Sequence, residues 1–237
     1  MAVTAKHVSI ENRLLKSLPE DQLARLSPHM EMMRLPQSRT LYEAGATVNN
    51  LYFPNDGMIS LLSMNGDGTT IEVGMVGNEG VVGLPIVLRI NTTPYGAMVQ
   101  LPSEVIKIRG EIVKAEFERP GPFNHLLLRY THVLLTQISQ SVVCNRFHTI
   151  EKRLCRWLLV ARDRVKHDTL HLTQEIIAHM LGISRTGVTT AAGALQKAGF
   201  IRYSRGRIVL IDRKAMEAFS CECYQITKEE FERFGDN

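Results

Sequence analysis

The sequence lacks long apolar runs, and this absence limits where the protein can reside. Its most apolar region, residues 73–90 of 237, is interrupted by Glu79, Pro85 and Arg89. A membrane-spanning helix needs about 20 consecutive, predominantly apolar residues, so this region is excluded as one. Residues 1–18 contain no apolar core of the kind that a secretory signal peptide requires. We therefore expect a cytoplasmic protein without a membrane partner.

Cysteine is scarce, with four in the chain and none in the first half: Cys144, Cys155, Cys221 and Cys223. Their spacing does not match a disulfide framework, so we expect reduced thiols. The Cys-Glu-Cys sequence at residues 221–223 is compatible with a redox or metal pair. Two thiols at this spacing are a weak signal, and apolar packing is the favoured interpretation. We predict no metal site and no cofactor.

The usual sequence signatures of catalysis are also missing. The chain contains no Gly-x-Ser-x-Gly nucleophile elbow, no phosphate-binding loop and no cluster of metal-ligating residues. Its composition, 44% hydrophobic and 22% charged, is typical of a globular protein. We therefore expect a globular protein that is not an enzyme.

Charge is distributed unevenly, although the formal net charge is only +4. Residues 1–148 carry 13 basic and 13 acidic side chains, whereas residues 149–214 carry 13 basic and 5 acidic ones. Residues 215–237 carry 2 basic and 6 acidic side chains. A basic surplus confined to one segment is expected of a surface that binds phosphates.

That basic segment contains the pattern of two short helices followed by a two-stranded wing, over residues 173–211. We expect Thr173 to cap the first helix and Ser184 to cap the second. Gly182 breaks the pattern between them, where a positive φ costs glycine little. The small Ala178, four residues earlier, allows the two helices to cross closely. Few arrangements other than a helix-turn-helix need these residues at these intervals.

The first half of the chain has the pattern of a β domain. Residues 41–108 contain short apolar runs separated by turn clusters at residues 54–57 and 65–68. Several short strands with such turns predict a jelly roll or a small barrel. The preceding residues 8–35 are amphipathic, and we predict helices there, interrupted at the prolines.

A long helix is predicted over residues 123–147, because apolar residues recur there at intervals of three and four. We expect this helix to pair with its counterpart in a second chain, through Leu127, Tyr130, Leu134 and Ile138. The alternative is that the helix packs only on its own β domain.

With this order of parts the chain resembles the Crp/Fnr family of bacterial transcription regulators over nearly its whole length. The resemblance is strongest over residues 149–211, where GISRTGV at residues 182–188 fits the family frame G-x-S-R-x-x-V. It implies an α+β protein with three parts: a jelly-roll sensor domain resembling cyclic-nucleotide-binding domains (1–120), a dimerisation helix (121–147) and a winged helix-turn-helix domain (148–237). It also implies a homodimer on a near-palindromic site in double-stranded DNA.

The resemblance also implies which residues meet DNA. Arg185 stands where the family has an arginine, and its guanidinium can contact guanine in a bidentate manner. Thr186 replaces the family's usual glutamate and Thr190 replaces a later arginine, with Thr189 beside it, so we expect a different operator sequence. The remaining predicted contacts, mostly to phosphates, are Thr173, Ser184, Lys197, Arg205 and Arg207.

The resemblance fails at the ligand signature of the sensor domain. Relatives that bind cyclic nucleotides have G-E-L and then R-[ST]-A, whose glutamate holds the ribose hydroxyl and whose arginine holds the cyclic phosphate. The corresponding stretches here are Gly83-Leu84-Pro85 and Tyr95-Gly96-Ala97. Without the phosphate-binding cation we expect no tight cAMP binding, and hence another effector or none. The N-terminal cysteines of the oxygen-sensing type are missing as well.

Two further hypotheses concern protein partners of this chain. One is a sensing or scaffold module that uses its winged helix for protein contacts, although the basic segment and Arg185 argue against it. The other concerns RNA polymerase, for which the resemblance implies a surface on the loop of residues 164–169. Lys166 and Asp168 are the residues we expect to contribute there.

Overall fold

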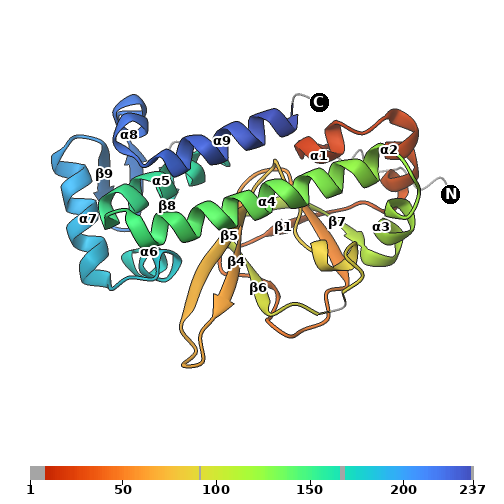
Figure 1. Cartoon of the computed structure of the whole chain (residues 1–237), viewed down its shortest axis with the longest axis horizontal. Coiled ribbons are helices and arrows are strands. Elements are labelled where there is room, and N and C mark those ends of the chain that lie inside the picture. Colours follow the sequence, from red (N-terminus) through yellow and green to blue (C-terminus); the bar gives the residue numbers. More distant parts are fainter. Residues whose placement is uncertain (1–8, 91, 166–168, 236–237) are drawn as a thin grey trace.

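The first half of the chain forms a β-rich body made of two antiparallel sheets (Figure 1). The computed structural model describes residues 9–90, 92–165 and 169–235. The sheets have the strand orders β1-β7-β3 and β2-β6-β4-β5. The strands are β1 (Glu31–Leu35), β2 (Thr40–Tyr42), β3 (Asn50–Pro54), β4 (Met58–Met64), β5 (Thr70–Val76), β6 (Tyr95–Leu101) and β7 (Ser103–Arg109). Apolar side chains from both sheets share one core, which confirms the predicted jelly-roll domain.

The N-terminal segment differs from the helices predicted for residues 8–35. Two short helices and a 3-10 turn precede the first strand: α1 (Arg13–Lys16), α2 (Glu20–Leu26) and η1 (Ser27–His29). Strand β1 then pairs with β7, from Glu31 opposite Lys107 to Leu35 opposite Ser103. The helical prediction is wrong for the part that forms β1, because pairing and packing in the sheet outweigh local helical periodicity.

A single long helix, α4 (Pro122–Phe147), runs from the β-rich body to the other end of the molecule (Figure 1). It has 26 residues and confirms the helix predicted for residues 123–147. Pro122 lies in its first turn, where proline's fixed φ suits a helix and its missing N–H is not needed. The shorter α3 (Gly110–Phe117) precedes it.

The far end of the molecule is a smaller domain built around a second core. Its elements are α5 (Ile150–Asp163), β8 (Thr169–His171), α6 (Gln174–Leu181), α7 (Arg185–Lys197), β9 (Ile201–Ser204) and β10 (Arg207–Leu210). The three strands form an antiparallel sheet of order β8-β10-β9. Trp157 of α5 and Val188 of α7 are buried in the same core. This is the predicted winged helix-turn-helix arrangement.

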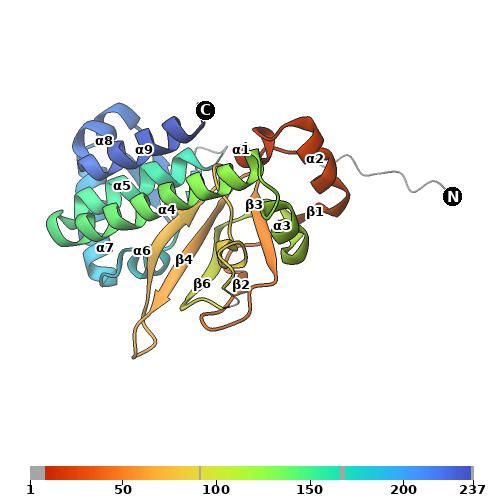
Figure 2. The same cartoon turned by 45° about the vertical axis from the view of Figure 1, so that its right-hand side comes forward.

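Two helices that the sequence analysis did not anticipate follow the wing: α8 (Arg213–Phe219) and α9 (Glu222–Gly235). Helix α9 turns back and lies along α4 in both views (Figures 1 and 2). It brings Phe231 and Phe234 into the first core, where the ring of Phe234 lies 6.1 Å from that of Tyr130. The end of the chain therefore ties the smaller domain to the β-rich body. No described helix is both long and apolar enough to cross a membrane.

Candidate nucleic-acid interface

Helices α6 and α7 form the centre of the candidate interface, and three residues fix their ends. Thr173 Oγ1 accepts a hydrogen bond from Ile176 N at 3.2 Å at the start of α6. Gly182 ends α6 with φ 62° and ψ 43°, a left-handed conformation that disfavours residues with a side chain. Ser184 Oγ accepts a hydrogen bond from Gly187 N at 3.1 Å at the start of α7. The predicted caps and turn are confirmed.

The buried side of α7 fixes the helix against its neighbours. Val188 is fully buried, and the small side chains of Ala191 and Ala192 allow close packing there. Arg153 of α5 donates a hydrogen bond to the carbonyl of Leu181 at the end of α6. Because its caps and its buried side are both held, α7 presents its exposed side in a defined orientation.

Four exposed side chains near the start of α7 form a surface that we call the reading face: Arg185, Thr186, Thr189 and Thr190. Thr189 Oγ1 donates to the carbonyl of Arg185 at 3.0 Å, and Thr190 Oγ1 donates to that of Thr186 at 3.1 Å. These two hydroxyl groups use their protons within the helix and offer lone pairs and a methyl group outward. The Arg185 guanidinium has no hydrogen bond or ion pair with a described residue.

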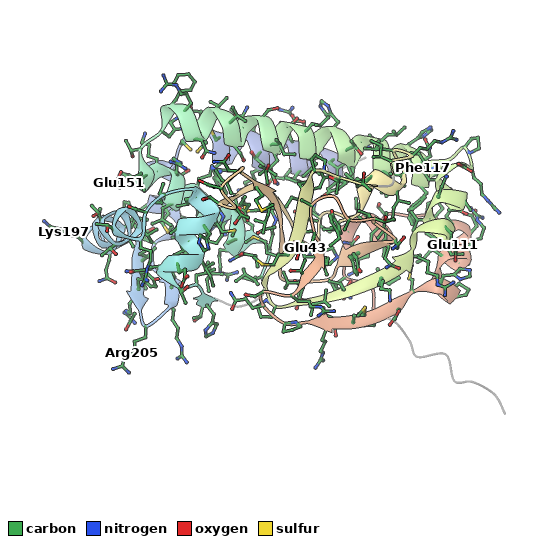
Figure 3. All side chains as sticks on the ribbon, turned by 90° about the horizontal axis from the view of Figure 1, so that it is seen from below. Glu43, Glu111, Phe117, Glu151, Lys197 and Arg205 are labelled. Carbon is green, nitrogen blue, oxygen red and sulfur yellow. The ribbon has the colours of Figure 1, made fainter. Side chains whose placement is uncertain are left out.

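The wing presents arginines around a tight turn. Between β9 and β10, Arg205 has φ 48° and Gly206 has φ 74°, the two positive angles typical of a type I′ hairpin turn. A positive φ costs an arginine roughly 1 kcal/mol. Arg205 nevertheless occupies the exposed tip and points away from the body (Figure 3). Arg207 and Arg202 are also exposed. Arg202 was not among the predicted DNA contacts, although the alternation of apolar and basic residues in β9 was a signal for it.

Tyr203 connects the wing to the helix-turn-helix. Its N–H donates to Gln196 Oε1 at 2.7 Å, and its hydroxyl donates to the carbonyl of Leu172 at 3.1 Å. Partial burial raises the pKa of Tyr203 above its usual value. Lys197 ends α7 and lies at the same end of the molecule as Arg205 (Figure 3). All nine residues predicted to meet DNA are exposed on or beside α6, α7 and the wing; their role stays a prediction.

Both domains match known protein families. The cyclic nucleotide-binding domain family matches residues 32–119, and the Crp-like helix-turn-helix domain family matches residues 152–219. The chain belongs to the Crp/Fnr family. No curated protein matches it in sequence.

Several solved structures share its fold. FixK2 from Bradyrhizobium japonicum is 15% identical, with a TM-score of 0.70 over 81% of this chain and 98% of its own. A CRP-family transcriptional regulator from Thermus thermophilus is 18% identical, with a TM-score of 0.66 over 79% of this chain and 96% of its own. The c-di-GMP-responsive regulator CLP from Xanthomonas campestris is 19% identical, with a TM-score of 0.62 over 82% and 100% of the two chains. These similarities establish the fold.

In this Crp/Fnr protein, the region that corresponds to the family's ligand signature is largely apolar. Gly83 starts the short 3-10 helix η2 (Leu84–Ile86) with φ 111°. The other four candidate residues are buried or half-buried: Leu84, Tyr95, Gly96 and Ala97. Arg89, the cation nearest in sequence, is exposed and pairs with Glu118 at 3.3 Å. Weak or absent cAMP binding stays a prediction.

The residues predicted for the dimer contact lie mostly in the chain's own core, so the prediction fails for the three buried ones and stays a prediction for the half-buried Ile138. Leu127, Tyr130 and Leu134 are buried within one chain, and Ile138 packs against the same core. The apolar stripe that the sequence reveals therefore faces the β-rich body. A different set of α4 side chains is exposed: Leu128, Leu135, Val142, Val143 and Phe147.

Polar contacts link the sensor domain directly to the DNA-binding domain of the Crp/Fnr fold. Trp157 Nε1 donates to Glu72 Oε1 at 2.7 Å, and Ser60 Oγ also donates to this carboxyl group. Burial raises the pKa of Glu72 to about 7. A second buried pair joins Glu79 of the sensor domain to Arg164 at 2.7 Å. The position of one domain thereby depends on groups in the other.

The hairpin between β4 and β5 also reaches the helix-turn-helix itself. A Cβ atom at Gly182 would lie 2.8 Å from Ile71 Cδ1, so this glycine both permits the turn and makes room for the hairpin. A cavity at this junction is lined by residues of the hairpin and of α6 and the turn that follows it. A shift of the hairpin would therefore act close to the start of α7.

Two other predictions concern residues of the smaller domain outside the helix-turn-helix. Lys166 and Asp168, expected to contact RNA polymerase, lie outside the described residues. Cys221 and Cys223 are buried, but they lie together with Cys144 and His148, and not only among apolar neighbours. The available signal for this grouping was the Cys-x-x-x-His spacing of residues 144–148, since residues four apart share one face of a helix. In the structure His148 lies just beyond the last residue of α4.

Proposed function

We propose that this protein is a transcription regulator, not an enzyme, that binds a near-palindromic site in double-stranded DNA as a homodimer. The reading face carries the proposal, because it combines an unpaired arginine with three threonines on a helix held from behind. A helix of this width fits the major groove, where arginine distinguishes guanine. Such a protein would act in the cytoplasm.

The wing supplies the sequence-independent part of the proposed binding. Arg202, Arg205 and Arg207 are exposed beside the reading face, and arginines in this position can neutralise phosphates. The threonines would accept hydrogen bonds from adenine or cytosine amino groups and place methyl groups against thymine. The reading face therefore differs from the family's Glu-and-Arg pattern in the bases it would select.

The homodimer in this proposal uses the exposed side of α4. Leu128, Leu135 and Val142 are spaced by seven residues and are 49%, 58% and 65% exposed in the single chain. A seven-residue apolar repeat on a helix is typical of coiled-coil pairing. Helix α9 lies along α4 (Figure 2). The three stripe residues stay exposed beside it, so they are accessible to a second copy.

The sensor domain in this proposal responds to an effector other than cAMP, or to none. Its signal would reach α7 through the contacts of Glu72 and Ile71 with the DNA-binding domain. A contact between the loop of residues 164–169 and RNA polymerase remains part of the proposal; Lys166→Ala and Asp168→Ala should impair activation in a reconstituted transcription assay while leaving DNA affinity unchanged.

The salt dependence of DNA binding distinguishes the proposed regulator from a scaffold that uses its winged helix only for protein contacts. Fluorescence anisotropy with labelled duplex DNA, repeated over a series of salt concentrations, should show affinity that falls steeply with salt. Removing one wing arginine should lower the slope by about 0.9 if that side chain neutralises one phosphate. Absence of measurable duplex binding at low salt would reject the proposal and favour a scaffold that contacts proteins.

A further inference from the structure

Four side chains that can bind a metal meet where the long helix joins the DNA-binding domain. We call them the thiol–imidazole cluster: Cys144, His148, Cys221 and Cys223. The first two come from the end of α4 and its cap. Cys221 directly precedes α9 and Cys223 lies in its first turn, so the cluster joins segments over 70 residues apart. Their four ligand atoms lie within 4.8 Å of one another.

The spacing within the cluster suits one tetrahedral ion. Cys144 Sγ lies 3.5 Å from Cys221 Sγ, and Cys223 Sγ lies 3.7 Å from His148 Nδ1. Zinc bonds of about 2.3 Å to sulfur and about 2.0 Å to nitrogen place neighbouring ligand atoms roughly 3.5–3.8 Å apart. Small side-chain movements would bring all four atoms onto such a tetrahedron.

The imidazole is oriented as a metal ligand would be. His148 Nε2 lies 3.2 Å from Glu222 Oε1, so the carboxylate favours the tautomer that carries its proton on Nε2. The unprotonated Nδ1 then faces the thiols, with its lone pair directed at Cys223. A carboxylate behind a histidine is the arrangement that orients imidazole ligands in zinc sites.

The surroundings act on the three thiols in both directions. The hydrogen bond between Cys144 and Cys221 lowers the pKa of Cys144 and raises the pKa of Cys221, burial raises the pKa of Cys223, and the charge of Arg156 opposes both increases. Arg156 is buried, and its Nε and Nη1 have no hydrogen-bond partner among the described residues. An ion of charge +2 with three thiolates and a neutral histidine has a net charge of −1, which this guanidinium would balance.

We propose that Cys144, His148, Cys221 and Cys223 bind a single Zn²⁺ ion in tetrahedral geometry. The ion would fix the C-terminal end of α4 to the first turn of α9, next to the start of α5. It would thereby set the angle between the long helix and the DNA-binding domain. The site is structural, since all four ligand positions come from the protein. Its existence does not depend on the proposed DNA binding.

Metal content of the full-length chain tests the site directly. Reduced protein, stripped with a chelator and supplied with Zn²⁺, should retain one ion per chain after buffer exchange, as measured by elemental mass spectrometry. With Co²⁺, the wild-type protein should show the intense visible bands of tetrahedral cobalt and a thiolate-to-cobalt charge-transfer band. These measurements need no variant. A chain that retains no ion when reduced, or a cobalt spectrum without thiolate ligation, would overturn the proposal. Cys144 and Cys221 would then be a hydrogen-bonded thiol pair without a metal.

Variants locate the site within the chain. Cys223→Ser and His148→Gln should each weaken Zn²⁺ binding more than 100-fold in competition with a chromophoric chelator. Glu222→Gln, which alters only the group behind His148, should weaken it about 10- to 100-fold. Cys155→Ser is the matched control, because Cys155 is equally buried but donates to the Met216 carbonyl away from the cluster. Equal loss in this control, or unchanged affinity in Cys223→Ser, would place the ion elsewhere and refute the assignment.

Discussion

Helix α7 and the ligand region of the sensor domain are both held in place by buried apolar side chains, but they differ in their polar side chains. In α7, buried Val188 holds the helix from behind, and exposed Arg185 occupies the family's arginine position. In the sensor domain, buried Leu84 and Ala97 hold η2 and β6, yet Tyr95 stands where relatives that bind cyclic nucleotides have an arginine. Core packing thus preserves both folds, whereas a few polar side chains decide what each can bind.

The sensor domain and the DNA-binding domain are also in direct contact. Glu72 and Glu79 of the sensor domain contact Trp157 and Arg164 of the DNA-binding domain. The sensor domain therefore restrains the position of the DNA-binding domain through contacts that do not involve the region around Leu84 and Tyr95.

Disrupting the dimer should produce the largest effect on the DNA-binding region. Leu135→Asp puts a charge in the centre of the exposed α4 stripe, where burial against a second chain is costly. We expect monomers in sedimentation velocity and a loss of more than 100-fold in operator affinity, since each half-site then binds alone. Leu88→Asp is the control, because Leu88 is similarly exposed on the sensor domain. A dimeric Leu135→Asp protein would show that the chains pair through another surface.

Removing the reading-face arginine should have the next largest effect. Arg185→Ala is expected to weaken specific binding by about 10- to 100-fold, the value of one bidentate contact with guanine. Discrimination at that base pair should decrease in the same anisotropy titrations. Arg34→Ala, at a sensor-domain arginine whose side chain is 89% exposed, should leave affinity unchanged. Similar losses in both variants would mean that Arg185 contributes only charge.

The buried carboxyl group between the domains should make stability depend on pH. The pKa of Glu72 is raised from 4.5 to about 7, so its contribution to stability is present below pH 4.5 and is lost as pH rises through 7. The free energy of unfolding should decrease by on the order of 3 kcal/mol when this contribution is fully lost. In Glu72→Gln, denaturant unfolding should show a smaller decline between pH 5 and pH 8. Glu43→Gln, at an exposed position, should keep the wild-type decline, and an unchanged profile in both would place the titration elsewhere.

Two glycine variants of the wing should distinguish the effect of side-chain charge on DNA binding from the effect of backbone conformation on stability. Arg205→Gly relieves a positive φ, so we expect unchanged or slightly higher stability, by up to about 1 kcal/mol. Arg207→Gly, within a strand, should lower stability by about 0.5–1 kcal/mol. Both variants should reduce the salt dependence of DNA binding by the same amount, since each removes one expected phosphate contact. A drop in stability for Arg205→Gly would indicate that its side chain, and not only the turn, stabilises the wing.

The smallest expected effect is that of cAMP. Calorimetry and thermal unfolding should show no saturable binding and no shift in Tm, because a ligand that binds the folded state would raise its stability. Saturable binding that persists in Tyr95→Phe and Arg89→Ala would contradict the prediction and reveal another nucleotide site.

Local sequence signals predicted the parts of the fold that depend on local chemistry. The caps at Thr173 and Ser184 and the turn at Gly182 each rest on hydrogen bonds or φ angles within a few residues. Strand β1 and the thiol–imidazole cluster depend on partners far away in the chain, which local periodicity cannot reveal. Helix α4 combines a local and a non-local property. Its length could be predicted from the apolar periodicity. Which of its apolar residues face the core of the same chain, and which stay exposed, depends on distant packing partners that the periodicity does not reveal.

Selection of bound sequences from a random duplex library tests the central claim most directly. We expect two related half-sites in inverted orientation, with centres about 10 base pairs apart or a multiple of that, and a guanine in each that Arg185→Ala no longer selects. Enrichment of such a palindrome by the wild-type protein would establish α7 as the reading element of a dimer. No enriched sequence, or one that Arg185→Ala selects equally well, would contradict the account.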